Sequence, residues 1–207
     1  MRHDECMVNS FILVRHAETP YSAQGRMNPD STVEVGLTAP GERAARGLGR
    51  DLAGEQIDAV AVAPSLRTRL TADALVADRN VPIHVIDQLA EIGVGPFEDG
   101  PVSVYTTWLR NNPLTAAPPG GESALDATTR FLTGWRRVLR LPAPVVLVVS
   151  HNLPLRMLLN AAAGDDPLAG PLQRIPNVTR HDVTRDQLET GLAALHRWRD
   201  ELAPKQG

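Results

Sequence analysis

Two apolar runs in this chain each end at polar residues that include a histidine. Residues 11–14 (Phe-Ile-Leu-Val) come directly before Arg15 and His16, and residues 145–149 (Val-Val-Leu-Val-Val) come directly before Ser150 and His151. Short apolar runs rich in β-branched residues are typical of strands in a parallel sheet that helices cover on both faces. The carboxyl ends of such strands form a ligand crevice, and histidine can attack or exchange protons near neutral pH. Both histidines are therefore candidate active-site residues.

The rest of the chain alternates further strand and helix patterns. These indicate strands over residues 57–62 and 83–86, and helices over 38–53, 67–75, 102–109, 125–139 and 153–163. Residues 179–183 and 188–195 fit either two strands or a strand and a helix. The alternation predicts an α/β fold, a three-layer α/β/α sandwich around a mostly parallel sheet. We expect residues 1–207 to form one domain, with a small cap at about 92–123 and a long functional loop at 17–36.

The bulk composition narrows the class of partners. The 207 residues are 43% hydrophobic with a formal net charge of −3, which fits a globular domain without the basic surface of a nucleic-acid-binding protein. No apolar run reaches the roughly 18 residues that span a bilayer, and the first six residues lack the apolar centre of a signal peptide. Cys6 is the single cysteine, and no zinc-type spacing occurs. We expect a cytoplasmic protein that uses no metal and binds neither nucleic acid nor membrane.

Five residues suited to phosphate binding or proton transfer lie near the predicted strand ends. They are Arg15, His16, Arg67, Glu91 and His151. Because the carboxyl ends of parallel strands share one edge of the sheet, we expect these side chains to meet in one crevice. Guanidinium groups match phosphate oxygens, and a carboxylate can protonate a leaving oxygen, so the sequence predicts a site for a phosphoryl group.

Six short segments match, in order, the motifs of a known family. They are Leu13–Thr19 (Leu-Val-Arg-His-Ala-Glu-Thr), Leu37–Gly41, Pro64–Ala72, Leu89–Glu98, Gly121–Ser123 and Val149–His151. The chain thereby resembles the histidine phosphatase superfamily, whose fold is called phosphoglycerate mutase-like and whose first motif is usually Arg-His-Gly-x-Thr. The resemblance extends through most of the chain and implies a single histidine phosphatase domain.

The resemblance also implies a role for each of the five residues. His16 would be the nucleophile that attacks phosphorus and becomes a phosphohistidine, and Glu91 would protonate the departing alcohol. Water would then release phosphate with Glu91 as the base, while Arg15, Arg67 and His151 hold the phosphoryl oxygens. This mechanism needs no metal and no other cofactor.

Residues around these five are expected to contact the substrate. The expected contacts are Tyr21, Ser22, Arg26, Glu122 and Asn152. Arg26 falls where the family has a substrate-contacting arginine, and Ser22 where many members have asparagine. Ala17 and Asn152 each replace a glycine that follows a histidine, which adds a side chain beside the phosphate. Glu122 is expected either to bind a catalytic arginine or to cap its helix.

The charge of the segments expected to cover the site bears on the substrate. Residues 17–36 contain one cation, Arg26, and residues 88–129 contain one, Arg110. A doubly phosphorylated substrate would need a second group of cations. Apolar and stacking surface would come instead from Tyr21, Phe97, Tyr105 and Trp108. We therefore expect a monophosphate ester whose leaving group is neutral, sugar-like, nucleoside-like or partly apolar.

Three functions stay open on the sequence. The first is a phosphatase that acts on a small phosphomonoester, the second a phosphoglycerate mutase-type phosphomutase, and the third a catalytically inactive regulatory or binding protein. The cation-poor segment 92–123 favours the phosphatase over the mutase, and the five intact residues argue against an inactive protein. The expected partner is a small-molecule phosphate ester, and the sequence leaves a homodimer open.

Overall fold

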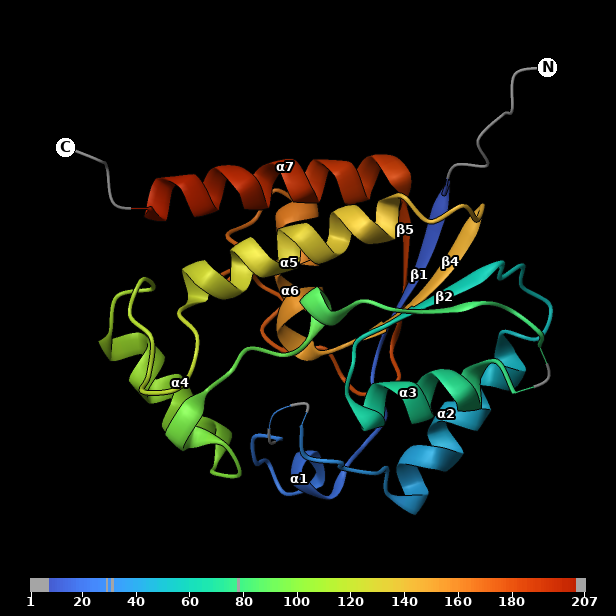
Figure 1. Ribbon diagram of the computed structural model, residues 1–207, viewed down its shortest axis with the longest axis horizontal. Coiled ribbons are helices and arrows are strands. Elements are labelled where there is room, and N and C mark those ends of the chain that lie inside the picture. Colours follow the sequence, from blue (N-terminus) through green and yellow to red (C-terminus); the bar gives the residue numbers. More distant parts are fainter. Residues whose placement is uncertain (1–7, 29, 31, 78, 204–207) are drawn as a thin grey trace.

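The computed structural model describes residues 8–28, 30, 32–77 and 79–203, and its centre is a five-stranded sheet (Figure 1). Cys6 lies outside these residues. The strands are β1 (Ser10–Arg15), β2 (Ala59–Val62), β3 (Ile83–Val85), β4 (Val145–Ser150) and β5 (Arg180–Thr184). Their order is β3-β2-β4-β1-β5, in which the first four are parallel and β5 is antiparallel to β1. The predicted, mostly parallel sheet is confirmed.

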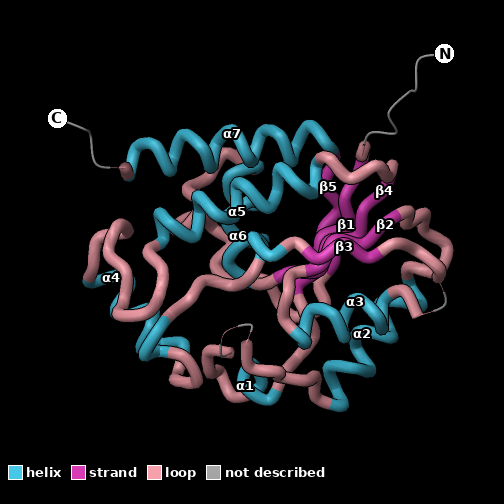
Figure 2. Tube along the Cα trace, in the orientation of Figure 1, coloured by secondary structure: helices cyan, strands magenta, loops and turns pink. Residues whose placement is uncertain are grey.

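Helices cover both faces of this sheet, which is the middle layer of three. One side carries α2 (Ala39–Asp51) and α3 (Leu66–Leu75), and the other carries α5 (Ala124–Leu139), α6 (Asn152–Ala162) and α7 (Arg185–Leu202). Figure 2 shows the magenta strands between the two groups. The other helical segments are α1 (Pro20–Ala23), η1 (Asp87–Leu89), η2 (Gly95–Phe97) and α4 (Val102–Asn111). The predicted α/β class and its three layers are confirmed.

Strand β1 shows why its apolar run is continuous. Phe11 and Leu13 are fully buried in the core shared with α5, α6 and α7. Ile12 and Val14 point the other way and are buried in the core shared with α2 and α3. Each face of the strand therefore needs apolar side chains, as expected for a strand between two helical layers.

The pairing of β1 with β4 brings both histidines to the same edge of the sheet. Arg15 pairs with Ser150 in parallel register, and the N–H of His16 donates to the carbonyl of Ser150 at 2.9 Å. His151 is the next residue of its strand end. The hydroxyl of Ser150 donates to the carbonyl of Leu89 at 3.1 Å, which ties η1 to the same edge.

The C-terminal region decides between the two alternatives that the sequence left open. It forms β5 followed by α7, so the strand-and-helix alternative is confirmed and the strand pair is wrong. A capping box starts α7, in which Thr184 Oγ1 accepts from the N–H of Gln187 and the Gln187 side chain accepts from the N–H of Thr184. The loop expected at 17–36 contains α1, which Thr19 caps and Pro20 opens.

The segment between η1 and α5 contains η2 and α4. Its rings Phe97, Tyr105 and Trp108 pack on one another with centroids 5.7 to 6.1 Å apart. The N–H of Met27 donates to the carbonyl of Gly100 at 2.8 Å, which joins this segment to the loop after β1. Two parts of the chain far apart in sequence thus lie together beyond the carboxyl end of β1.

Candidate active site

All five residues predicted to be catalytic line one cavity of about 360 Å³. They are Arg15, His16, Arg67, Glu91 and His151. The two arginines expose 7% and 2% of their surface and the two histidines 2% and 1%, whereas Glu91 is half-buried. Burying ionisable side chains is costly, and such groups gathered in a cavity are typical of a functional site. The structure therefore brings the predicted residues together.

The imidazole of His16 is oriented by a hydrogen bond at the end of β1. Its Nδ1 lies 2.8 Å from the carbonyl of Ala17, which can only accept, so Nδ1 carries the proton and Nε2 keeps its lone pair. Burial lowers the pKa of His16 well below its usual value, and the charges of Arg15 and Arg67 lower it further. His16 is therefore neutral near neutral pH, which is the form that can act as a nucleophile.

Two further side chains hold the backbone beside His16. Thr71 Oγ1 accepts from the N–H of Ala17 at 2.9 Å and donates to the carbonyl of Arg67 at 2.6 Å. Asn177 Nδ2 donates to the carbonyl of His16 at 2.7 Å. Ala17 is not among the described residues with a positive φ, so its methyl group adds no backbone strain where glycine is usual.

The two buried arginines stay charged despite their burial. Nη1 of Arg15 donates to the carbonyl of Ile175 at 2.6 Å, while Arg67 lies in the first turn of α3. Burial lowers the pKa of each guanidinium to about 10, although the negative charge of Glu91 raises both pKa values. Both side chains are thus cations at neutral pH and are suited to bind an oxyanion.

His151 faces His16 across the cavity from the N-cap position of α6. The two ring centroids are 5.3 Å apart, and His151 Nε2 lies 3.4 Å from Ser65 Oγ. Nδ1 of His151 is buried with no hydrogen-bond partner in the described part of the chain. Burial lowers the pKa of His151 well below its usual value, and Arg67 lowers it further. A buried ring nitrogen without a partner is costly, and such a cost is typical of a residue that serves function and not stability.

The carboxylate of Glu91 lies at the amino end of α6. Its Oε2 accepts from the N–H of Leu153 at 3.4 Å, and its Oε1 accepts from the N–H of Ile92 at 3.1 Å. The amino end of a helix carries partial positive charge, which favours a carboxylate there. Glu91 is thereby directed at the cavity, where it can exchange a proton with a ligand.

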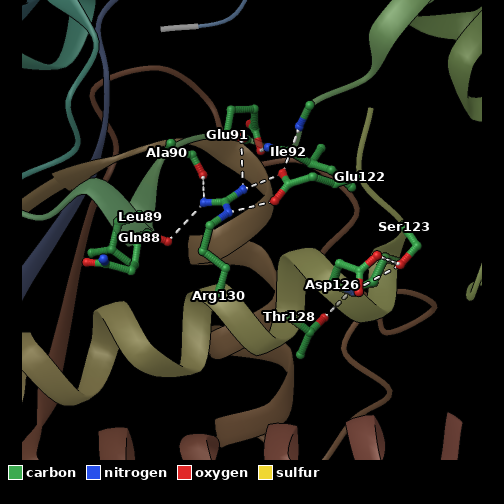
Figure 3. Close-up of polar contacts among 12 residues, drawn as sticks. Gln88, Leu89, Ala90, Glu91, Ile92, Glu122, Ser123, Asp126, Thr128 and Arg130 are labelled. Atoms are coloured by element: carbon green, nitrogen blue, oxygen red, sulfur yellow. Dashed lines mark hydrogen bonds and ion pairs between the residues drawn. The ribbon is translucent and has the colours of Figure 1, made fainter. Parts of the chain in front are cut away.

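Arg130 of α5 holds the segment that carries Glu91 (Figure 3). Its Nη1 donates to the carbonyls of Gln88 and Ala90, both at 3.0 Å, and its Nη2 donates to the carbonyl of Glu91 at 3.2 Å. These carbonyls lie 39 to 42 residues earlier in the chain, so no sequence pattern pointed to Arg130.

Glu122 neither binds one of the predicted catalytic arginines nor caps its helix. It also does not line the cavity of about 360 Å³ described above, which we call the main cavity. Its Oε1 and Oε2 accept from Nε and Nη2 of Arg130 at 2.8 and 2.6 Å, and Oε2 also accepts from the N–H of Gly93 at 3.0 Å (Figure 3). Ser123 is the residue that caps α5. Partial burial raises the pKa of the Glu122 carboxyl, but the hydrogen bonds from Arg130 and from the N–H of Gly93 outweigh it, so the pKa is lowered. Glu122 thus holds Arg130 and the backbone that follows Glu91.

The other predicted substrate contacts differ in their placement. Arg26 lines the main cavity and Tyr21 does not. The guanidinium of Arg26 pairs with the carboxylate of Asp99 at 2.8 Å and lies over the Tyr21 ring, 5.2 Å from its centroid. Asp99 thereby compensates the charge of Arg26 outside the cavity.

Ser22 and Asn152 also line the main cavity, and each is held by the backbone. Ser22 Oγ accepts from the N–H of Thr19 at 2.9 Å within the capping box of α1. Asn152 Oδ1 accepts from the N–H of Ile175 at 2.9 Å. The side chain that replaces a glycine at position 152 therefore fixes the loop before β5 and also borders the cavity.

Two arginines that the sequence analysis did not single out line the same cavity. They are Arg156 of α6 and Arg174 of the loop between α6 and β5. Residues 17–36 and 88–129 contribute Arg26 to this lining, and Arg156 and Arg174 add positive charge from elements outside those two segments. The expected aromatic surface is also smaller, because Tyr105 lines the cavity whereas Phe97 and Trp108 pack beside it.

A smaller cavity of about 240 Å³ adjoins the first. Both cavities are lined by Arg67 and Glu91. The smaller one is also bordered by the carboxylates of Asp30, Glu98 and Glu122. Arg130, which is paired with Glu122, also lines the smaller cavity, and Glu91 borders both cavities.

No three His, Cys, Asp or Glu side chains in the described part of the chain gather as metal ligands. None of the helices described for this chain combines the length and the apolar character that a bilayer span requires.

A three-layer α/β protein with buried arginines, facing histidines and a carboxylate in one crevice belongs to the class of proteins that process phosphoryl groups. The family model of the histidine phosphatase superfamily (branch 1) matches residues 11–201, so the chain belongs to that family.

Relatives with names and solved structures agree with this assignment. Phosphoserine phosphatase 1 of Hydrogenobacter thermophilus is 30% identical over 166 residues, which are 75% of this chain and 76% of that protein. A Bacillus subtilis protein named uncharacterized phosphatase PhoE is 29% identical over 161 residues, which are 77% of this chain and 80% of that protein. The crystal structure of the alpha-ribazole phosphatase from Shigella flexneri has a TM-score of 0.73 at 24% identity, covers 84% of this chain and 89% of that chain, and shows the shared fold. The chain is a phosphatase of the histidine phosphatase type.

Proposed function

We propose that the protein hydrolyses a small phosphomonoester through a phosphohistidine formed on His16. The observation that carries this proposal is the state of His16. Its Nδ1 is bound to the carbonyl of Ala17, and its pKa is lowered by burial and by Arg15 and Arg67. A neutral imidazole with a lone pair on Nε2, between two guanidinium groups, is suited to attack a bound phosphoryl group.

In the first step, the phosphoryl oxygens are held by Arg15, Arg67 and His151 while Nε2 of His16 attacks phosphorus in line with the leaving oxygen. The N–P bond forms as the ester P–O bond breaks. Glu91 gives its proton to the leaving oxygen, so the alcohol departs neutral. The guanidinium groups balance the charge of the transferring group, which is the main demand of phosphoryl transfer on a protein.

In the second step, water attacks the phosphohistidine. Glu91 takes a proton from the water as the new P–O bond forms, the N–P bond breaks, and inorganic phosphate leaves with His16 restored. The smaller cavity is lined by Glu91 and Arg67. It offers water a route separate from the cavity that the alcohol occupies.

That second route favours hydrolysis over the mutase alternative. A phosphomutase must keep water away from its phosphorylated intermediate. Transfer of label between substrate positions without phosphate release would favour the mutase instead. The alternative of an inactive binding protein is weakened because all five residues meet in one cavity.

We further propose that the reaction uses no metal and that residues 92–123 act as a cap within a single domain. The positive charge that a metal would supply can come from Arg15 and Arg67, which are buried beside His16. Turnover that persists after dialysis against a chelator is the expected result, and turnover that returns only with added metal would contradict it. The cap would cover the leaving alcohol with Tyr105 and neighbouring residues of α4.

A panel of phosphomonoesters tests the proposed function. We expect phosphate release by the native protein and a loss of at least about 10³-fold in His16→Ala, because the nucleophile is removed. His84→Ala is the matched control, since His84 lies in β3 outside both cavities. Equal turnover in His16→Ala and His84→Ala would refute the assignment of His16.

A further inference from the structure

The main cavity contains cations that the proposed mechanism does not use. Arg156 and Arg174 both line it, and Nη1 of Arg156 donates to the carbonyl of Gln173 at 2.8 Å. This hydrogen bond joins α6 to the loop that carries Arg174. Nε of Arg156 is buried without a hydrogen-bond partner in the described part of the chain. Arg156 is thus joined to the loop that carries Arg174, and both side chains border the cavity.

Arg156 lies on the side where the leaving alcohol must be. The N–H of Leu153 binds the carboxylate of Glu91 at 3.4 Å, and Arg156 follows three residues later on the same face of α6. At about 1.5 Å per residue, this places Arg156 roughly 5 Å farther along the helix. Burial lowers the pKa of Arg156, and the nearby Glu91 and Tyr105 raise it. Because Glu91 protonates the leaving oxygen, Arg156 borders the group attached to that oxygen.

The surface around this part of the cavity is apolar. Its side chains come from the cap, from α6 and from the loop after α6: Ile92, Val102, Leu109, Leu153 and Leu168. A short carbon chain would lie well against such a surface. Among the described residues that line the main cavity, Glu91 is the one carboxylate. A negative charge on the leaving group would therefore be attracted by the arginines and repelled by one carboxylate at most.

We propose that Arg156 and Arg174 form an anion subsite for a carboxylate on the leaving alcohol. The proposal rests on the proposed function and names its substrate class, the monophosphate esters of small hydroxy acids. A single negative charge fits better than a second phosphate, because Arg156 already uses one nitrogen for Gln173 and Arg174 is exposed. The charge of Arg26 is compensated by Asp99. The neutral leaving group expected from the sequence is replaced by an acidic one.

A matched pair of substrates tests the subsite. Glycerate 3-phosphate and glycerol 3-phosphate share a carbon skeleton and differ in one carboxylate. We expect kcat/KM to be about ten- to a hundredfold higher for the acid, the range expected for charge-assisted hydrogen bonds. Arg156→Gln and Arg174→Gln should each lower this preference about tenfold. Arg110→Gln is the control, since Arg110 is an exposed arginine of α4 outside the cavity, and it should keep the preference.

Inhibition by inorganic phosphate separates the subsite from the phosphoryl site. If Arg156 and Arg174 bind only the leaving group, the two variants should keep the inhibition constant of inorganic phosphate within about threefold. A loss of phosphate inhibition as large as the loss of preference would place these arginines in the phosphoryl site and overturn the proposal. Melting temperatures of the variants identify any loss that comes from unfolding.

Two other outcomes are decisive. A higher kcat/KM for 2,3-bisphosphoglycerate than for glycerate 3-phosphate, lost in Arg156→Gln, would show that the subsite binds a phosphate and not a carboxylate. Equal kcat/KM for the acid and the alcohol, with p-nitrophenyl phosphate still hydrolysed, would refute the subsite alone. Absence of phosphate release from all of these esters would refute the proposed function itself.

Discussion

Replacing Arg130 by methionine should weaken the proton donor without altering the lining of the main cavity. Arg130 makes three hydrogen bonds to carbonyls around Glu91 and two to Glu122. Methionine keeps the apolar stem but leaves the segment around Glu91 free to shift. A misplacement of about 1 Å can cost about 10²-fold, and general acid catalysis contributes about 10²- to 10⁴-fold. We therefore expect kcat for an alkyl phosphate to fall by about 10²-fold.

The leaving group distinguishes this positioning effect from general damage. p-Nitrophenolate departs without a proton, so kcat for p-nitrophenyl phosphate should fall less than about tenfold in Arg130→Met. The side chains of Arg130 and Glu122 expose 24% and 29% of their surface. Breaking their contacts should therefore lower the free energy of unfolding by roughly 3 kcal/mol, which is less than the largest losses seen for a fully buried pair. That corresponds to a Tm lower by roughly 6 to 12 °C. Equal losses for both substrates, measured well below Tm, would refute the positioning role.

Three further predictions concern the residues around His16. Thr71→Val keeps the shape of the side chain but removes the acceptor of the Ala17 N–H, so steady-state kinetics should show kcat about tenfold lower; an unchanged kcat would contradict this. Burial lowers the pKa of His16 and of His151 in the folded protein. The unfolded chain then binds more protons below about pH 6.5, and stability should fall as pH drops below that value, by up to about 1.4 kcal/mol per pH unit for each histidine. Urea unfolding of the native protein and of His16→Ala between pH 7.5 and 5 gives the free energy of unfolding as a function of pH. An equally steep dependence on pH in the two proteins would count against this prediction. Because the pKa values of Arg15 and Arg67 are lowered to about 10, kcat/KM should decline near pH 10 while Tm shows the protein still folded. A profile that stays flat through that range would contradict charged arginines as the phosphate ligands.

The sequence predicted the sheet and the strand-end residues because both depend on local patterns. The runs at 11–14 and 145–149 are continuous since both faces of each strand are buried, and such strands pair in parallel. The ends of parallel strands then coincide, which is why Arg15, His16 and His151 could be placed in one crevice.

The residues that the sequence did not reveal act through tertiary contacts. Arg130 binds carbonyls about forty residues earlier, and Arg174 lies in an irregular loop, so neither shows a pattern. Arg156 did leave a signal, because it lies in the first turn of the helix predicted over 153–163, which begins directly after His151 and Asn152. The role of Glu122 depends on Arg130 of α5, and no sequence pattern links these two side chains.

Identification of the phosphorylated residue during turnover tests the central claim most directly. Glu91→Gln with p-nitrophenyl phosphate is the suitable case. Phosphorylation of His16 by this substrate needs no general acid, whereas hydrolysis of the phosphohistidine lacks its general base, so the intermediate should accumulate. After an alkaline quench, which preserves a phosphorus–nitrogen bond, mass spectrometry of peptides should locate the phosphoryl group on His16. It should be absent in the double variant His16→Ala, Glu91→Gln. A phosphoryl group on another residue, or continued turnover without any on His16, would contradict the account.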